Sequence, residues 1–243
     1  MNLVVDGHTH SITSIHAYST IQEMAKEAAA NGIEMFALTD HGPAIHGTHE
    51  FYFTNLKTIP SSMYGVRILK GIEANIVDFR GSLDLDAKYL KNLDYVIASF
   101  HDVVIPPSSK EEHTNALINV LKNPLVDTLG HPGNPAFPVD IDAVVKTARD
   151  YGKLIEINNH SFEARAGCLE NCREFIMKCI KYGVKIVCSS DAHISFDVGR
   201  FDKIHSLFEE CNVPDELIMS RSVERFDEYF KVKAQRLKAA NIA

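Results

Sequence analysis

Short apolar runs alternate with longer segments of helical periodicity along the whole chain. The apolar runs predict strands at 3–7, 35–40, 66–76, 95–100, 126–130, 154–158 and 184–189. The amphipathic segments predict helices at about 20–31, 50–62, 111–122, 140–151, 168–182, 198–211 and 222–239. Strands that alternate with helices are typical of a parallel sheet in an α/β fold. No low-complexity linker interrupts the pattern, so we expect residues 1–243 to form a single domain.

The first of these units has a clear helix start. Ser19 or Thr20 can cap the helix, and Glu23 stands where a capping box would place it. Asn31 and Gly32 end the apolar periodicity. Residues 3–32 are therefore predicted to form one complete strand–helix unit.

Histidines and carboxylates gather where the predicted strands stop. Nine such residues are His8, His10, His16, His41, Glu73, His101, His131, Asp191 and His193. They can meet only if the sheet curls so that the carboxyl ends of its strands converge at the mouth of a barrel. Imidazole and carboxylate are metal ligands, and nine of them are too many for one ion. The pattern predicts a multinuclear metal site.

Composition narrows the class of protein. A chain of 243 residues with 45% hydrophobic content is long enough for the core of an α/β barrel. We find no apolar stretch that could span a membrane and no signal peptide, and the five cysteines form no CxxC pair. We therefore expect a cytoplasmic protein. The net charge of −7 offers no basic surface for long nucleic acid.

The motifs around these residues resemble those of the PHP (polymerase and histidinol phosphatase) superfamily. They are His8-Thr9-His10, His16-Ala17-Tyr18-Ser19, Thr39-Asp40-His41-Gly42, Gly71-Ile72-Glu73-Ala74-Asn75, His101, Gly130-His131-Pro132-Gly133-Asn134-Pro135 and Ser190-Asp191-Ala192-His193. Glu156-Ile157-Asn158-Asn159 and Glu170-Asn171-Cys172-Arg173-Glu174 make the chain most similar to the YcdX-type branch of probable phosphatases. The resemblance spans residues 3 to about 230.

This resemblance implies a distorted (β/α)7 barrel with three divalent ions, usually Zn²⁺, at the C-terminal mouth of the strands. Mn²⁺ and Fe²⁺ also accept mixed imidazole and carboxylate ligands. The first ion would be held by His8, His10, Glu73 and Asp191. Glu73 would bridge to a second ion, held also by His101 and His131. The third would be held by His16, His41 and His193. A homotrimer is implied as well.

The implied reaction is hydrolysis of a small phosphate monoester by a hydroxide that bridges two of the metals. Three divalent ions would change the formal charge from −7 to −1 and would concentrate positive charge in one pocket. Such a pocket favours a small phosphorylated metabolite. Two further residues are candidates for catalysis: Asp40, which could orient an imidazole or protonate the leaving group, and Arg165, which could contact a phosphate oxygen.

The alcohol that leaves should be recognised by the loops 42–60, 102–115 and 160–168. His46, His49 and His160 lie in these loops and are candidate substrate contacts. Glu156 lies three residues before the loop, deeper than the candidate ligands, and we expect it to form hydrogen bonds inside the barrel rather than to bind metal.

Three other functions remain open at this stage. An amidohydrolase also begins with His-x-His, but it uses a bridging lysine where this chain has Glu73, and it has no place for His16, His41 and His193. A PHP-type 3′-exonuclease would act on DNA ends, which the acidic composition disfavours. A non-catalytic protein would bind the metals without turning over any ester.

Overall fold

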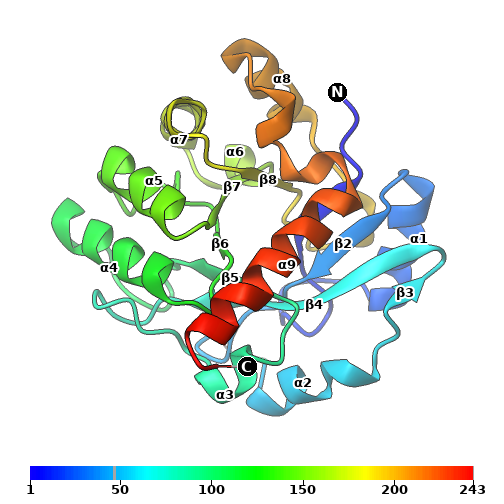
Figure 1. Ribbon diagram of the computed structural model, residues 1–243. Coiled ribbons are helices and arrows are strands. Elements are labelled where there is room, and N and C mark those ends of the chain that lie inside the picture. The colour runs from blue at the N-terminus through cyan, green and yellow to red at the C-terminus, as the bar shows by residue number, and fades with distance from the viewer. Residues whose placement is uncertain (46–47, 243) are drawn as a thin grey trace.

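A nearly closed barrel of parallel strands forms the centre of the molecule (Figure 1). The computed structural model describes residues 1–45 and 48–242, so His46 lies outside the described residues. The strands of the barrel, in order around the sheet, are β1 (Val5–Thr9), β2 (Met35–Leu38), β4 (Val66–Asn75), β5 (Tyr95–Ser99), β6 (Thr128–Leu129), β7 (Leu154–Asn158) and β8 (Ile186–Ser189). Each pairs in parallel with the next. The distorted (β/α)7 barrel is thereby confirmed.

The two ends of the sheet meet between β1 and the segment that follows β8. Asp191 N donates to His8 O and His10 N donates to Ala192 O, both at 2.9 Å. Gly7 makes this approach possible, because a Cβ at that position would lie 2.2 Å from Val187 Cγ1. The first and last strands of the barrel are therefore in direct contact.

Helices cover the outside of the barrel. They are α1 (Ile21–Ala30), α2 (Glu50–Asn55), α3 (Ala87–Leu90), α4 (Lys110–Lys122), α5 (Ile141–Asp150), α6 (Ser161–Ala164), α7 (Cys168–Tyr182), α8 (Asp202–Cys211) and α9 (Val223–Ala239). The capping box expected at α1 is present, formed by Thr20 and Glu23. None of these helices, within the described part of the chain, is long and apolar enough to cross a membrane.

The segment 50–62 differs from the prediction of one helix. Helix α2 ends at Asn55 and continues only as a 3-10 turn over Leu56–Thr58. Pro60 then excludes helical backbone before it. The chain forms instead a short strand, β3 (Ser62–Met63), which pairs antiparallel with β4.

Helix α9 crosses the end of the barrel opposite the strand carboxyl ends, as the red helix in Figure 1 shows. Its Phe226 and Tyr229 pack against barrel residues such as Val5 and Met35 in one buried apolar cluster. Lys233 Nζ donates to Asp127 Oδ2 at 2.6 Å, and Arg236 Nη2 donates to Asp127 Oδ1 at 3.0 Å. The helix thus closes one end and leaves the other open. That residues 1–243 form a single domain stays a prediction.

Candidate metal centre

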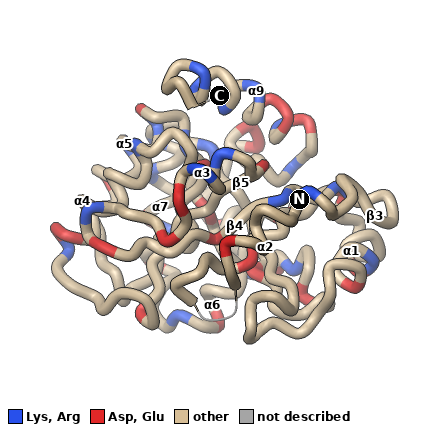
Figure 2. The backbone as a smooth tube through the Cα atoms, turned by 90° about the horizontal axis from the view of Figure 1, so that it is seen from below, with Lys and Arg blue, Asp and Glu red and all other residues tan. Residues whose placement is uncertain are grey.

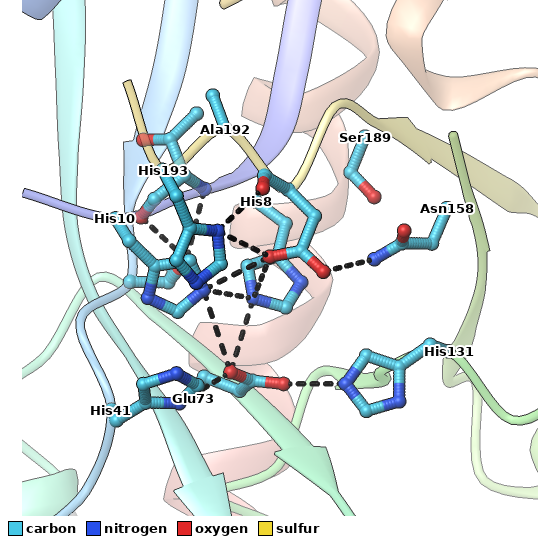
Figure 3. A network of polar contacts seen from close by, with 12 residues as sticks. His8, His10, His41, Glu73, His131, Asn158, Ser189, Ala192 and His193 are labelled. Atoms are coloured by element: carbon cyan, nitrogen blue, oxygen red, sulfur yellow. Dashed lines mark hydrogen bonds and ion pairs between the residues drawn. The ribbon is translucent and has the colours of Figure 1, made fainter. Parts of the chain in front are cut away.

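The nine histidines and carboxylates predicted from the sequence gather at the open end of the barrel. His8 and Glu73 lie within β1 and β4, whereas the others follow the ends of their strands. Figure 3 shows Glu73 in the middle, with one oxygen toward His131 and the other toward the histidines of the N-terminal segment. The convergence expected from the strand ends is therefore observed.

The first group consists of His8, His10, Asp191 and one oxygen of Glu73. Nε2 of His8 lies 3.0 Å from Nε2 of His10 and 3.3 Å from Glu73 Oε2. His10 Nε2 lies 3.1 Å from Asp191 Oδ1. All four side chains are at most 5% exposed. Four ligand atoms thus face one small volume.

The second group uses the other oxygen of the same glutamate. Glu73 Oε1 lies 2.8 Å from His131 Nε2 and 3.2 Å from His101 Nε2. Because its two oxygens face different imidazoles, the Glu73 carboxylate stands between the two groups.

The third group consists of His16, His41 and His193. His16 Nε2 lies 3.3 Å from His41 Nε2 and 3.0 Å from His193 Nε2. The other ring nitrogen of His41, Nδ1, lies 2.8 Å from Glu73 Oε2. His41 therefore links this group to the glutamate.

The donor set fits divalent metal ions. Two nitrogens bound to one tetrahedral Zn²⁺ at the usual bond length lie about 3.3 Å apart, close to the separations of 3.0–3.3 Å among the imidazole nitrogens. Glu73 Oε2 and His41 Nδ1 are buried, and although they lie 2.8 Å apart neither makes a hydrogen bond. Buried polar atoms of this kind normally have a partner, and a cation would supply it.

Hydrogen bonds on the far side of the rings fix how these imidazoles point. His8 Nδ1 lies 2.8 Å from Glu156 Oε1, and His193 Nδ1 lies 2.8 Å from the Asp191 carbonyl. Both partners can only accept, so each Nδ1 carries a proton and each Nε2 is the ring nitrogen that faces the centre. The expected role of Glu156 inside the barrel is confirmed by this contact.

His10 and His101 are oriented in the same way. His10 Nδ1 lies 3.1 Å from Ser14 Oγ, whose own hydrogen goes to Asp40 Oδ1 at 2.7 Å. His101 Nδ1 lies 2.7 Å from Asn75 Oδ1. Reasoning from the sequence missed Ser14 and Asn75, because a lone serine or asparagine near a strand end carries no distinctive signal.

Charge and burial shift the pKa values of the side chains in this centre. Burial alone would raise the pKa of Glu73, but His8, His101 and His41 hold it well below its usual range. Burial, followed by the repulsion of Arg165, lowers the pKa of His131 to about 4. An ionised glutamate beside a neutral imidazole is the state that binds a metal.

Two residues of the centre have unusual backbone. His131 has φ of 29° and Asp191 has φ of 56°, values that are rare for residues other than glycine. Asp6 supports the second of these turns by accepting hydrogen bonds from Ser190 N and Gly199 N. Strained backbone of this kind is found at sites where geometry is imposed by function.

Asp40 does not line the mouth. Its carboxylate is fully buried and accepts hydrogen bonds from Ser11, Ser14 and Tyr52. With every lone-pair direction occupied and no exposure, it is poorly placed to protonate a leaving group. A direct acid role for Asp40 stays a prediction that this burial disfavours, and Asp40 is linked to His10 through Ser14.

A cavity of about 980 Å³ opens above the centre. Arg165 and His160 line it, and Arg165 Nη1 lies 3.9 Å from Asp191 Oδ2. His49 instead caps α2 by accepting from Phe51 N, and it is absent from the described lining of this cavity. Of the loop histidines, His160 is thus placed toward the substrate space and His49 away from it.

Fold and site together define an α/β barrel with a histidine and carboxylate centre at its C-terminal mouth. Residues 6–164 match the model of the PHP domain, and the chain belongs to that family. A probable phosphatase of Acetivibrio thermocellus is 61% identical over 239 residues, which cover 98% of this chain and 99% of that protein. Probable phosphatase TTE1963 of Caldanaerobacter subterraneus subsp. tengcongensis is 50% identical over 240 residues, covering 98% and 94%.

A similar fold occurs in a solved structure. Histidinol phosphate phosphatase of Lactococcus lactis, crystallised with zinc, L-histidinol and phosphate, superposes with a TM-score of 0.61. The match covers 86% of this chain and 94% of that chain, at 16% sequence identity. At this identity the likeness shows the fold alone.

Proposed function

We propose that this protein is a phosphatase that uses three divalent metal ions to hydrolyse a small phosphate monoester. The observation that carries the proposal is Glu73, whose two oxygens face two separate groups of imidazoles. The relatives named as probable phosphatases and the fold shared with a histidinol phosphate phosphatase support the same reaction class.

The three groups of side chains correspond to three ion positions. We assign His8, His10, Glu73 and Asp191 to the first, Glu73, His101 and His131 to the second, and His16, His41 and His193 to the third. Zn²⁺ fits this nitrogen-rich, thiol-free set best, and Mn²⁺ or Fe²⁺ would also be accepted. Bound ions of this kind supply an acidified water and neutralise phosphoryl oxygens during displacement.

The side chains around the centre bind and orient. Arg165 donates to Ser161 Oγ at 2.9 Å and borders the cavity, so its guanidinium can turn a second N–H toward a phosphate oxygen. Glu156 and Asn158 hold His8 and Asp191, the latter through a hydrogen bond of 3.0 Å from Asn158 Nδ2 to Asp191 Oδ2. The cavity wall from Ile45, Phe100 and Val103 offers an apolar surface to the alcohol of the ester.

Charge distribution favours a small substrate over long nucleic acid. In Figure 2, Lys and Arg are interspersed with Asp and Glu around the chain and do not form one continuous basic band. The net charge of −7 agrees with this. We propose a cytoplasmic enzyme, and we propose the homotrimer on the resemblance to YcdX-type proteins.

Glu73→Ala tests the proposal. Losing the shared carboxylate should lower phosphate release from monoesters by at least about a hundredfold and should reduce the amount of bound metal. A residue that binds the metal directly should contribute at least as much to metal affinity and activity as the residues that orient such ligands. Phosphate release across a panel of phosphorylated metabolites, with metal content measured by mass spectrometry, provides both readouts.

The matched control is Glu228→Ala, which removes an exposed carboxylate on α9 and should leave both values unchanged. Wild-type turnover by Glu73→Ala would refute the mechanism. Amide or ester hydrolysis without phosphatase activity would favour an amidohydrolase, trimming of single-stranded DNA would favour an exonuclease, and metal binding without any turnover would favour a non-catalytic protein.

A further inference from the structure

The chain folds back on itself immediately after β4. Ile76 pairs with Leu83 in an antiparallel bridge, and Asp84 N donates to Asn75 O at 3.1 Å. Asn75 N donates in return to Asp84 Oδ1 at 2.8 Å. This turn places the Asp84 carboxylate directly behind Asn75, the last residue of β4.

Asp84 determines which way the Asn75 amide points. Asn75 Nδ2 donates to Asp84 Oδ2 at 2.5 Å and to Gly42 O at 3.2 Å. Both amide hydrogens are used, so Asn75 Oδ1 faces the opposite way and accepts from His101 Nδ1. His101 is thereby held with Nε2 toward Glu73.

Asp84 also holds the segment that follows His41. Ala44 N donates to Asp84 Oδ2 at 2.9 Å, and Ala44 lines the substrate cavity. A Cβ at Gly42 would lie 2.4 Å from both Asp84 oxygens, so only glycine lets the carboxylate approach. Gly42 N donates to Glu73 O at 2.9 Å, which fixes the other side of this segment.

We propose that Asp84 is a positioning residue that serves the second and third ion positions together: it orients His101 through Asn75, and it anchors the backbone that carries His41. The inference rests on the proposed assignment of His101 and His41 as metal ligands. A carboxylate that merely stabilised its own turn would not need contacts to Asn75 Nδ2 and Ala44 N.

Asp84→Asn tests this role, because it keeps the shape but turns an amide NH₂ toward groups that are themselves donors. Groups that orient a ligand typically contribute 10- to 100-fold to metal affinity. We therefore expect the zinc-loaded variant to release metal at a chelator concentration about 10- to 100-fold lower than wild type does, whether or not a substrate is known.

Asp78→Asn is the matched control. Asp78 lies in the same turn and accepts from Arg80 N and Ser82 N, without contact to Asn75. Gly42→Ala should reproduce the loss by displacing Asp84 with both side chains intact.

Wild-type metal retention by both Asp84→Asn and Gly42→Ala would overturn the inference. If the wild-type protein itself binds no divalent metal, the proposed function fails, and this inference with it. A wild-type protein that binds metal but has no phosphatase activity would count against the proposed reaction. The positioning role of Asp84 would then still be tested by the chelator titrations.

Discussion

Glu156 accepts hydrogen bonds from four groups around the centre and does not line the cavity. Its Oε1 accepts from His8 Nδ1 and Ser189 Oγ, and its Oε2 accepts from His131 N and Asn158 Nδ2. Four donors around one carboxylate require two acceptor oxygens. No neutral side chain of the same size can replace it.

Glu156→Gln should therefore weaken the proposed centre even though we assign Glu156 to none of the ions. The amide NH₂ would face two donors in either orientation, so we expect metal affinity and turnover to fall about 10- to 100-fold. Chelator titration and steady-state kinetics measure the two effects. Glu174→Gln, on the exposed side of α7, should match wild type; equal behaviour of both variants would show that His8 needs no support from Glu156.

The clustering of the candidate ligands could be predicted from the sequence because these residues follow apolar runs. His8 and His10 stand two positions apart in extended chain, where side chains share a face. The residues that orient them could not be predicted. Asn75 meets His101, and Asp84 meets Ala44, only after separate segments fold together, and Ser14 is a lone serine near His10 in the chain. Asp40 illustrates the difference: its link to an imidazole was expected, but the intervening Ser14 was not.

At the scale of elements, α9 depends on a charge cluster at the closed end of the barrel. Lys233 is 8% exposed in its side chain, and its partner Asp127 is fully buried. Lys233→Ala would remove one of the two cations that neutralise this carboxylate. Breaking a buried pair from one side costs on the order of 3 kcal/mol.

We therefore expect Lys233→Ala to lower the free energy of unfolding by about 3 kcal/mol. Denaturant titration followed by circular dichroism measures it. Lys231→Ala, two positions earlier on the same helix and exposed, should change stability by less than about 0.5 kcal/mol. A similar small loss for Lys233→Ala would mean that Arg236 alone neutralises Asp127.

Elements with strong periodicity were predicted well, and short ones were not. Helix α7 and strand β7 have the predicted bounds. Strand β6 is paired only over Thr128–Leu129, although the apolar run of 126–130 is longer. Apolar character reports burial, whereas pairing depends on the register of the neighbouring strands.

At the scale of the whole molecule, metal ions should stabilise the fold as well as serve chemistry. The proposed ligands come from both chain ends, and ions bind the folded barrel but not the unfolded chain in this geometry. An ion present at a hundred times its dissociation constant adds about 2.7 kcal/mol per site. Treatment with a chelator should therefore lower the melting temperature measurably.

Differential scanning calorimetry with and without chelator measures this shift, and re-addition of zinc should reverse it. Glu73→Ala provides the comparison, because a chain that has lost the shared ligand should respond less to the chelator. An identical melting temperature with and without metal would show that the centre contributes nothing to stability.

The seam between β1 and the segment after β8 has a consequence for synthesis. His16 and His193 are 177 positions apart in the chain, yet their Nε2 atoms lie 3.0 Å apart. A ribosome must therefore release nearly the whole barrel before the proposed third ion position can form, and a chain interrupted upstream of Asp191 would also lack part of the proposed first. Loading of the first and third proposed positions therefore requires a chain that is complete as far as His193, whereas the proposed ligands of the second position all precede Asp191.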